Sequence, residues 1–592
     1  MTTQRCAMQG LPDARYQFGG LLGQRIGLNQ EHWLLTAPQA NPGMLAILYD
    51  RDRLPRRDLV PWAGEFAGKY LTSAVLCYRL TRDPRLAQQI ERFVATFVAA
   101  QDDDGYLGPF PRSERLSGTI LDGRGRTWDL WGHYHAILGL LLWHAESDDG
   151  NALRAASRAG DLICDTFLGT GRRMLEAGDE EMNQAISHGL CLLYQVTGIE
   201  RYLAMAREVE RDWEAPASGD YVRAALAGTP FWQMRKPRWE SLHSVQAILS
   251  LYEMTGEERY RRAFEAIWQS IHDGDIHNTG GFSSGEAATG NPYDPRAIET
   301  CCTVAWMALC VDMLRLTGDP RVADALELAT LNATLGAQSP SGRWWTYNTP
   351  MDGVRRASAH DIVFQAREGT PELNCCSVNG PRSLGMLSQW AVLRSERGLA
   401  LNYYGPGTIT VPCEGGLLTL RQETDYPRDG RIEIAIEVEG SAAELALGLR
   451  VPAWSQQTGL ARNGSALAQP APGAYAWLEG PWRPGDRITF DMDLRPRFWM
   501  GEREAAGKTS IYRGPLLLAY DRWLNTMDPD DLPALATEKV TLTRTSLAPA
   551  VVEPWIALET YAADGTRLVL CDFASAGAAG TPYRTWLPLD RR

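Results

Sequence analysis

The chain has 592 residues, of which 44% are hydrophobic and 22% charged, so it has the composition of a globular protein and the length of two or three domains. Its net charge of −13 argues against binding to nucleic acid or to an anionic membrane, because phosphate contacts need clustered lysines and arginines. The N-terminus lacks the apolar segment of a signal peptide and no apolar run is long enough to span a membrane, so we expect a cytoplasmic protein. With no export signal, the 11 cysteines are expected to be free thiols or metal ligands.

A helical repeat runs through the first part of the chain. At Thr81, Thr197, Thr255 and Thr317 an apolar helix ends in Thr-Arg or Thr-Gly, and another begins after an acidic residue or Asp-Pro. Glycine past a helix end and proline at a helix start follow the usual capping preferences. The spacing is close to 60 residues or twice that, and residues 144–153 hold a degenerate copy. One helical hairpin per period, closed into a ring, predicts an (α/α)6 toroid over residues 1–392.

The acidic run Asp102-Asp103-Asp104 falls between two of these helices. It is typical of a solvated turn, although an acidic loop at the mouth of a ring could reach a sugar hydroxyl.

The pattern changes after residue 400. Short alternating or β-branched runs separated by Gly, Pro and Asp predict a β-sandwich over residues 393–522, with a tight turn at Asn463-Gly464. Residues 523–592 hold further strand-like runs that complete or extend this sandwich, and the sequence leaves open whether there are one or two. The fold class is therefore multidomain α + β.

Four residues in two short motifs could bind a metal. Glu299 and Cys301 lie in IETCC, and Cys375 and Cys376 lie in NCCS, 74 residues after Cys301. Zinc takes thiolate and carboxylate ligands in a closed tetrahedral site, although thiolate sites also accept iron. A bound metal would hold the thiols deprotonated, and a thiolate beside a substrate pocket is a nucleophile. For the cysteine pair alone, a buried structural role is the alternative.

Several motifs around these residues resemble one enzyme family. GG-x-x-x-GE ends at Glu286, ETC covers 299–301, a Tyr-Asn-x-Pro turn begins at Tyr347, and the cysteine pair follows. Together with GEFAGKY (64–70), DGYLG (104–108), LRVPAW (449–454), the W-x-x-GD turn (482–486) and RGPLLLAY (513–520), they are similar to the zinc-thiolate β-L-arabinofuranosidase family of glycoside hydrolases. The resemblance covers most of the chain.

The resemblance implies a helical toroid with β-sandwich domains and a retaining mechanism. It implies Zn2+ bound by the four residues named above, with Cys375 as the nucleophile and Glu286 as the general acid/base in a partly apolar site. For Glu286 alone, a helix-capping role is the alternative.

Sugar-binding residues follow less directly from the resemblance. Tyr347, His243 and His135 are expected to contact the substrate, and His133 competes with His135 because residues i and i+2 cannot share one helical face. A satisfied core histidine is the alternative for His135 and His243.

The leading hypothesis is a retaining exo-glycosidase that releases a terminal furanose, such as β-L-arabinofuranose, from a small oligosaccharide or glycoside. Three departures from the family leave the sugar open: a 13-residue interval between Glu286 and Glu299, Ser377-Val378-Asn379 after the cysteine pair, and an additional Cys302. The alternatives are a related hydrolase or lyase for another plant-derived sugar, and a non-catalytic carbohydrate-binding protein with a structural zinc, because four protein ligands make a closed site. A homodimer is left open.

Overall fold

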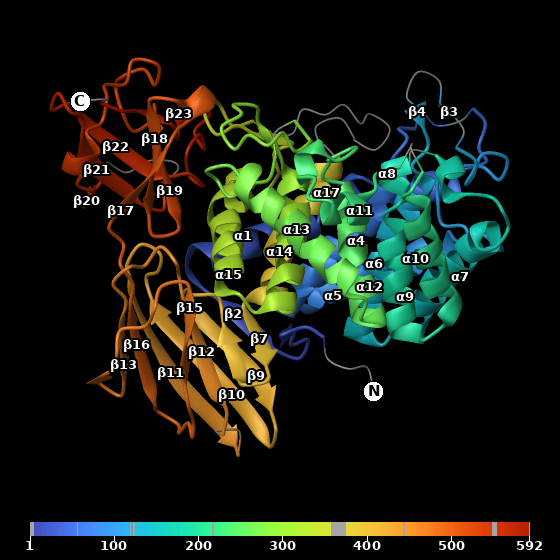
Figure 1. Ribbon diagram of the computed structural model, residues 1–592, viewed down its shortest axis with the longest axis horizontal. Coiled ribbons are helices and arrows are strands. Elements are labelled where there is room, and N and C mark those ends of the chain that lie inside the picture. The colour runs from blue at the N-terminus through green and yellow to red at the C-terminus, as the bar shows by residue number, and fades with distance from the viewer. Residues whose placement is uncertain are drawn as a thin grey trace.

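The computed structural model describes residues 5–590, apart from 357–373, 548–552 and the short stretches 56, 58, 119, 122–124, 179, 216–217, 284 and 442–443. A helical domain fills one side of the molecule, and two β-domains lie along the other side, one above the other (Figure 1).

The helical domain is a closed ring of inner helices with outer helices packed against it. In the described part of the chain each inner helix contacts the next, and the last contacts the first. The inner helices are α4 (Glu65–Thr81), α6 (Asp129–Ser147), α9 (Ile186–Thr197), α12 (Ser241–Thr255), α14 (Thr300–Thr317) and α17 (Cys375–Gly385). The outer helices are α5 (Pro84–Ala99), α7 (Gly150–Phe167), α10 (Glu200–Asp212), α13 (Glu258–Gly274) and α15 (Pro320–Leu328). The predicted helical toroid is confirmed.

Shorter helices connect the hairpins and lead into the ring. They are α1 (Gly20–Asn29), α2 (Ala37–Ala40), α3 (Gly43–Tyr49), α8 (Glu180–Asn183), α11 (Tyr221–Leu226), α16 (Leu335–Ala337) and α18 (Leu387–Trp390).

The capping repeat explains why the period is visible in the sequence. The hydroxyls of Thr197, Thr255 and Thr317 each donate to the carbonyl four residues earlier at 2.7–2.8 Å and accept from the amide two residues later at 3.2 Å. The glycine that follows each threonine is left-handed, with φ between 65° and 74°. In the degenerate copy Ser147 takes the place of the threonine and Asp148 that of the glycine.

Helix α14 is apolar because of its place in the ring. Among the described residues it has the length and hydropathy to cross a membrane, yet 83% of that window is buried inside the structure. An inner helix is covered on every side, so it has no polar face.

The middle domain is a β-sandwich of two sheets, and the N-terminus contributes an edge strand to each. One sheet has the order β1-β7-β8-β12-β15 and the other β14-β13-β16-β11-β10-β9-β2. The strands are β1 (Met8–Gln9), β2 (Arg15–Phe18), β7 (Val392–Ser395), β8 (Gly398–Leu401), β9 (Gly407–Cys413), β10 (Gly416–Thr424), β11 (Arg431–Gly440), β12 (Ala446–Val451), β13 (Gly459–Arg462), β14 (Ser465–Ala466), β15 (Ala474–Leu478) and β16 (Arg487–Asp491). The turn at Asn463-Gly464 joins β13 to β14, with positive φ at both residues, as predicted.

The C-terminal domain is a separate sheet that begins earlier than the sequence predicts. Its strands are β17 (Pro496–Met500), β18 (Lys508–Arg513), β19 (Leu516–Asp521), β20 (Thr543–Arg544), β21 (Ala557–Tyr561), β22 (Arg567–Asp572), β23 (Tyr583–Arg584) and β24 (Leu587–Pro588). Because β19 pairs with β22 and β23, a boundary between residues 522 and 523 would divide one sheet. The strand patterns of residues 496–521 do not reveal which sheet they join, since that depends on pairing distant in sequence.

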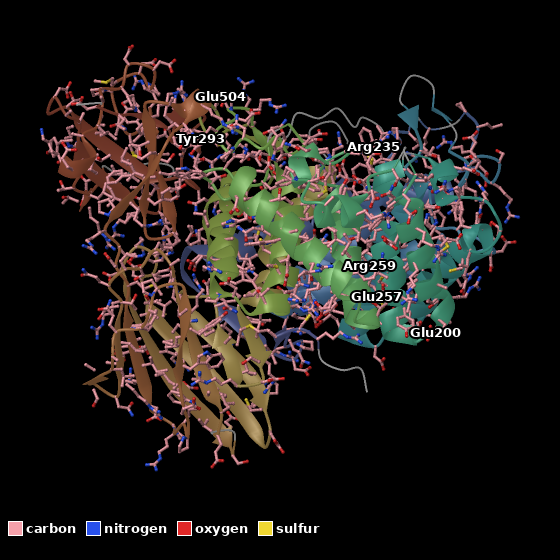
Figure 2. All side chains as sticks on the ribbon, viewed as in Figure 1. Glu200, Arg235, Glu257, Arg259, Tyr293 and Glu504 are labelled. Carbon is pink, nitrogen blue, oxygen red and sulfur yellow. The ribbon has the colours of Figure 1, made fainter. Side chains whose placement is uncertain are left out.

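The C-terminal domain also anchors loops of the helical domain. The Asn278 amide donates to Ser510 at 2.9 Å and to Thr585 at 2.8 Å. Further along the same loop, Tyr293 lies beside this domain (Figure 2), and Asn291 donates to Glu504 at 2.8 Å. These contacts hold the loop on which Glu286 lies.

Candidate active site

The four predicted metal ligands come together in one buried cluster. The Cys376 sulfur lies 3.3 Å from Glu299 Oε1 and 3.6 Å from the Cys301 sulfur. The Cys375 sulfur lies 3.7 Å from the same oxygen and 3.9 Å from the Cys376 sulfur. One ligand atom from each residue lies within 4.8 Å of all the others, and all four residues are buried.

This donor set fits a tetrahedral thiophilic ion. Zinc–sulfur bonds of about 2.3 Å at tetrahedral angles place two sulfurs about 3.8 Å apart. The cluster has sulfur–sulfur distances of 3.6 and 3.9 Å. These two sulfur–sulfur distances fit a tetrahedral ion, and the Cys3Glu cluster could bind a metal.

Two helix N-termini converge on the cluster. Glu299 precedes the first residue of α14, and Cys375 is the first residue of α17. Helix α17 begins with a capping box, in which the Asn374 side chain accepts from the Ser377 amide and the Ser377 hydroxyl accepts from the Asn374 amide, both at 2.9 Å. Because helix N-termini carry partial positive charge, both helices favour thiolate at the cluster.

Burial and mutual repulsion act against ionisation of the four clustered groups. Burial and the charge of Cys375 raise the pKa of Glu299 well above its usual value, and burial likewise raises that of Cys376. Burial acts in the same direction on Cys301, but hydrogen bonds from the two other thiols lower its pKa to about 6. A cation bound among the four groups would relieve both effects.

A buried lysine, which sequence reasoning missed, lies next to the cluster. Lys69 forms an ion pair with Glu65 at 2.8 Å, and its ammonium lies 5.3 and 4.8 Å from the ring centres of Trp131 and Trp239. Burial lowers the pKa of Lys69, but the charges of Glu65, Cys301 and Cys375 together raise it above its usual value. The lysine therefore stays charged.

The register of two inner helices places Lys69 at this point. Ser73 donates to the carbonyl of Val378 at 2.6 Å, and Cys77 donates to that of Pro381 at 3.3 Å, so α4 and α17 run side by side in the same direction. Lys69 lies one helical turn before Ser73 on α4, and this places Lys69 level with the start of α17.

Glu286 lies at the edge of the cluster beside Tyr347. The Tyr347 hydroxyl donates to Glu286 Oε1 at 3.2 Å, and Arg238 donates to Oε2 at 2.7 Å. Glu286 has a left-handed backbone, with φ of 73°, which is uncommon for a residue with a side chain. The expected partly apolar surroundings are not found, because Glu286 is half-buried and paired with an arginine.

Tyr347 connects Glu286 to the cluster. Burial and then the negative charges of Cys375, Glu299 and Cys376 raise the pKa of its hydroxyl. Its carbonyl accepts from the Thr300 amide at 2.9 Å, directly after Glu299. The structure thus brings the predicted nucleophile, the predicted acid/base and Tyr347 into one site.

His135 on α6 and His243 on α12 are both buried, and α9 lies between their two helices in the ring. Their ring centres lie 5.8 Å apart. Burial lowers the pKa of both well below the usual value, so both are neutral at physiological pH. Within the described residues, no nitrogen of His135 has a hydrogen-bond partner, and neither does Nε2 of His243. A third buried histidine, His188, was missed by sequence reasoning and contacts the Tyr134 hydroxyl at 3.1 Å.

His133 has a different environment from His135. Its Nδ1 lies 2.8 Å from the Asp129 carbonyl, and its Nε2 lies 3.1 Å from the Leu107 amide. Both ring nitrogens are thus engaged with backbone, in contrast to those of His135.

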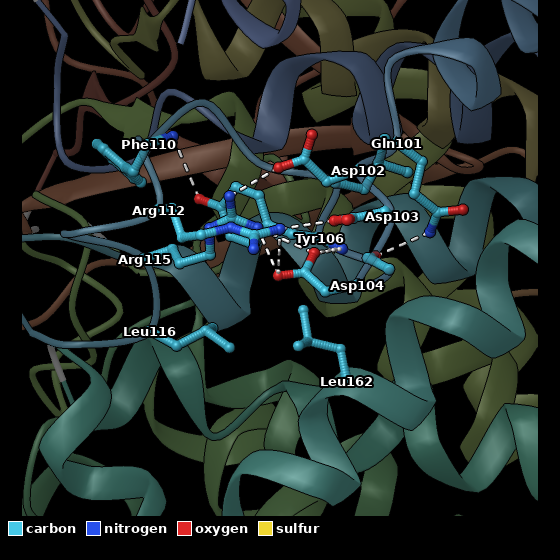
Figure 3. A network of polar contacts seen from close by, with 12 residues as sticks. Gln101, Asp102, Asp103, Asp104, Tyr106, Phe110, Arg112, Arg115, Leu116 and Leu162 are labelled. Carbon is cyan, nitrogen blue, oxygen red and sulfur yellow. Dashed lines mark hydrogen bonds and ion pairs between the residues drawn. The ribbon is translucent and has the colours of Figure 1, made fainter. Parts of the chain in front are cut away.

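The acidic run beside the DGYLG motif is neutralised by arginines (Figure 3). Arg115 donates to Asp104 at 2.8 Å and to Asp102 at 2.7 Å, and Arg112 donates to Asp103 at 2.6 Å. These pairs fix the turn and leave its carboxylates bound to the protein.

Two of the departures from the family pattern touch the cluster. Asn379 donates to the Cys301 sulfur at 3.4 Å, and Cys302 lies 3.9 Å from Glu299 Oε2 and 3.5 Å from the Ser283 hydroxyl. The Cys302 thiol is not one of the four clustered ligands.

Comparison with known proteins identifies the family. Residues 32–389 match the catalytic domain of the GH127 beta-L-arabinofuranosidases, and residues 398–494 match the middle domain of the same family. A non-reducing end beta-L-arabinofuranosidase of Bifidobacterium longum subsp. longum is 24% identical over 506 residues, which cover 78% of this chain and 75% of the relative.

Two solved structures share the complete fold. A GH127 beta-arabinofuranosidase superposes with a TM-score of 0.82 at 19% identity, covering 99% of both chains. A GH127 beta-L-arabinofuranosidase from Geobacillus stearothermophilus T6 has a TM-score of 0.78 at 19% identity, covering 97% of this chain and 100% of the other. On the match of its catalytic and middle domains, the chain belongs to glycoside hydrolase family 127, the beta-L-arabinofuranosidase family, and is a glycoside hydrolase.

Proposed function

We propose that this enzyme is a retaining exo-glycosidase that releases a terminal β-L-arabinofuranose from a small glycoside, with Cys375 as the nucleophile and Glu286 as the general acid/base. Tyr347 supports this assignment because its hydroxyl donates to Glu286 at 3.2 Å and its pKa is raised by burial and then by the charge of Cys375. The activity named for the Bifidobacterium relative supports the choice of sugar.

The metal is proposed to be zinc, held by Glu299, Cys301, Cys375 and Cys376. Their distances and their buried, mutually repelling charges fit a divalent thiophilic ion. When bound, zinc would keep the thiols deprotonated at neutral pH.

In the first step the Cys375 sulfur attacks the anomeric carbon and the bond from that carbon to the leaving oxygen breaks. Glu286 gives its proton to that oxygen. In the second step Glu286 takes a proton from water, whose oxygen displaces the sulfur from the anomeric carbon. Two displacements at the same carbon retain its configuration.

The surroundings of Glu286 suit the second step. Tyr347 and Arg238 both donate to its carboxylate, and such hydrogen bonds favour the charged form that acts as a base. A leaving group bound in the site must compete with Arg238 for Oε2 when Glu286 acts as the acid.

We further propose that His135 and His243 bind hydroxyls of the sugar and that Tyr347 positions Glu286. His135 and His243 offer buried ring nitrogens that have no partner in the described part of the chain. His133, whose two nitrogens bond backbone, would act by holding the DGYLG loop in place.

The test is hydrolysis of p-nitrophenyl β-L-arabinofuranoside by the purified protein under reducing conditions, with NMR detection of the anomer first released. We expect release of the β-anomer, loss of activity in Cys375→Ser and normal activity in Cys413→Ser, a thiol outside the cluster. Release of the α-anomer would refute the retaining mechanism. No release from this substrate, with turnover of another glycoside, would refute the choice of sugar.

A further inference from the structure

A chain of polar contacts leads from His243 on α12 to the neighbouring inner helix α14. His243 Nδ1 lies 3.1 Å from Gln246 Oε1, and Gln246 Nε2 donates to Asp312 Oδ2 at 2.8 Å. Asp312 Oδ1 accepts from Arg315 at 3.3 Å. His243 and Gln246 are buried, and Asp312 is largely buried.

These contacts determine which nitrogen of His243 carries the proton. A carboxylate only accepts hydrogen bonds, so the Gln246 amide must turn its NH2 group to Asp312 and its oxygen to His243. An oxygen facing Nδ1 requires a proton on Nδ1. The neutral ring then has no proton on Nε2, the nitrogen without a partner among the described residues.

The contacts of Tyr134 agree with this assignment. Its hydroxyl lies 3.0 Å from His243 Nδ1 and 3.1 Å from His188 Nδ1. The proton on His243 Nδ1 is then shared between the Gln246 oxygen and this hydroxyl, and the hydroxyl donates in turn to His188.

We propose that Gln246 and Asp312 are positioning residues that fix His243 with Nε2 as a hydrogen-bond acceptor for a hydroxyl of the bound sugar. The choice of sugar as ligand rests on the proposed function, whereas the proton position rests on the contacts alone. We call the chain of hydrogen bonds from Asp312 through Gln246 to His243 the relay. It favours a ligand group that donates to His243 Nε2 over one that only accepts.

Asp312→Asn tests the relay because it reverses every donor and acceptor along it. Arg315 Nη2 is paired with Glu253, but Nη1 still donates toward residue 312, so the introduced asparagine would turn its oxygen to Nη1 and its NH2 group to Gln246. Gln246 would then turn its own NH2 group to His243, which moves the ring proton to Nε2. We expect kcat/KM for p-nitrophenyl β-L-arabinofuranoside to fall about 10- to 100-fold, mostly through KM, because a buried donor faces a donor.

The double variant Asp312→Asn/Gln246→Glu restores the original pattern. The introduced glutamate would accept from both His243 and the introduced asparagine, so we expect kcat/KM to return to within a few-fold of wild type. Gln246→Met keeps the Asp312 charge but breaks the relay, and we expect it to lose as much as Asp312→Asn. A normal KM in folded Asp312→Asn, or no recovery in the folded double variant, would overturn the proposal.

A spectrum of the free protein separates this proposal from the proposed function. In 15N-histidine-labelled protein, with the His243 signals assigned from His243→Asn, we expect a protonated Nδ1 in wild type and a protonated Nε2 in Asp312→Asn. If wild type hydrolyses no β-L-arabinofuranoside, the proposed function fails while the spectrum still decides the relay. A protonated Nε2 in wild type would refute the relay whatever the activity.

Discussion

The Tyr347 hydroxyl lies 3.2 Å from the carboxylate of Glu286, and the Tyr347 backbone is tied to the residues that begin helix α14. Its carbonyl accepts from the Thr300 amide at 2.9 Å, and strand β5 (Ile298–Glu299) pairs with β6 (Asn348–Thr349). This short sheet therefore holds Tyr347, and through it Glu286, beside Glu299 of the Cys3Glu cluster.

Tyr347→Phe removes the hydrogen bond to Glu286 and keeps the ring. We expect kcat/KM to fall about 10- to 100-fold, since a hydrogen bond to a charged group contributes about 1.5–3 kcal/mol. Metal content should not change, because the hydroxyl is not one of the clustered ligands. Steady-state kinetics with metal analysis checks this, and Tyr520→Phe in the C-terminal domain is the control. Normal kinetics in Tyr347→Phe would exclude it from positioning Glu286.

Variants of the neighbouring residues Cys301 and Cys302 can distinguish a metal site from a group of buried cysteines. We expect Cys301→Ser to lose bound metal and to unfold at a lower temperature, because the site then lacks one thiolate ligand. Cys302→Ser is the matched control, since Cys302 lies on the same helix and is equally buried but outside the cluster. Metal analysis and thermal unfolding measure both. Equal metal content in the two variants would contradict the four-ligand site.

Lys69 should influence the pH at which metal is released. A positive charge beside thiols favours thiolate, so removing it raises the thiol pKa values and protons compete better with the metal. We expect Lys69→Met to release metal at higher pH than wild type, by about one pH unit. Lys69→Met/Glu65→Gln removes both charges of the ion pair and should release metal close to the wild-type pH. Metal retention after dialysis over a pH series checks this, with exposed Lys539→Met as the control, and an unshifted curve in Lys69→Met would refute it.

Buried histidines should make the fold sensitive to acid. Burial lowers the pKa of His188 to about 3 and that of His277 to about 4, against an ordinary value near 6.5 in the unfolded chain. Stability is therefore complete above the unfolded pKa and is lost as pH falls from about 6.5 toward the folded values, because the unfolded chain binds the protons. At pH 5.5 each histidine costs about 1.4 kcal/mol of unfolding free energy.

Denaturant unfolding at pH 7.5 and 5.5 measures this loss. We expect His188→Asn to lower the difference between the two pH values by about 1.4 kcal/mol, and His32→Asn, at an exposed position, to leave it unchanged. An unaltered difference in His188→Asn would show that this histidine is protonated in the folded protein.

The sequence predicts the ring because each hairpin repeats the same cap. Thr197, Thr255 and Thr317 make the same pair of hydrogen bonds, so the same local motif recurs at the end of successive inner helices. The cluster is also predictable, because its four ligands lie in two short motifs at helix starts. In contrast, no local pattern assigns β17 to the C-terminal sheet, whose partners lie far along the chain.

Lys69 was missed although the repeat contains a signal for it. Lys69, His135 and His243 each lie 12 residues before the capping residue of their inner helix, Thr81, Ser147 or Thr255. Residues at the same place in each repeat of a closed ring face its centre. Aligning Lys69 with His135 and His243 would therefore have placed it at the centre of the ring. Arg238 carries no such signal, because it lies in a connecting loop and reaches Glu286 through tertiary contact.

A covalent intermediate between the sugar and Cys375 can be trapped and located. Glu286→Gln lacks the base of the second step, whereas p-nitrophenolate leaves without an acid, so the sugar should accumulate on the enzyme. After mixing with p-nitrophenyl β-L-arabinofuranoside, peptide mass spectrometry should find one pentosyl group on Cys375, and none on Glu286→Gln/Cys375→Ser. A pentosyl group on Glu299 or another side chain would contradict Cys375 as the nucleophile.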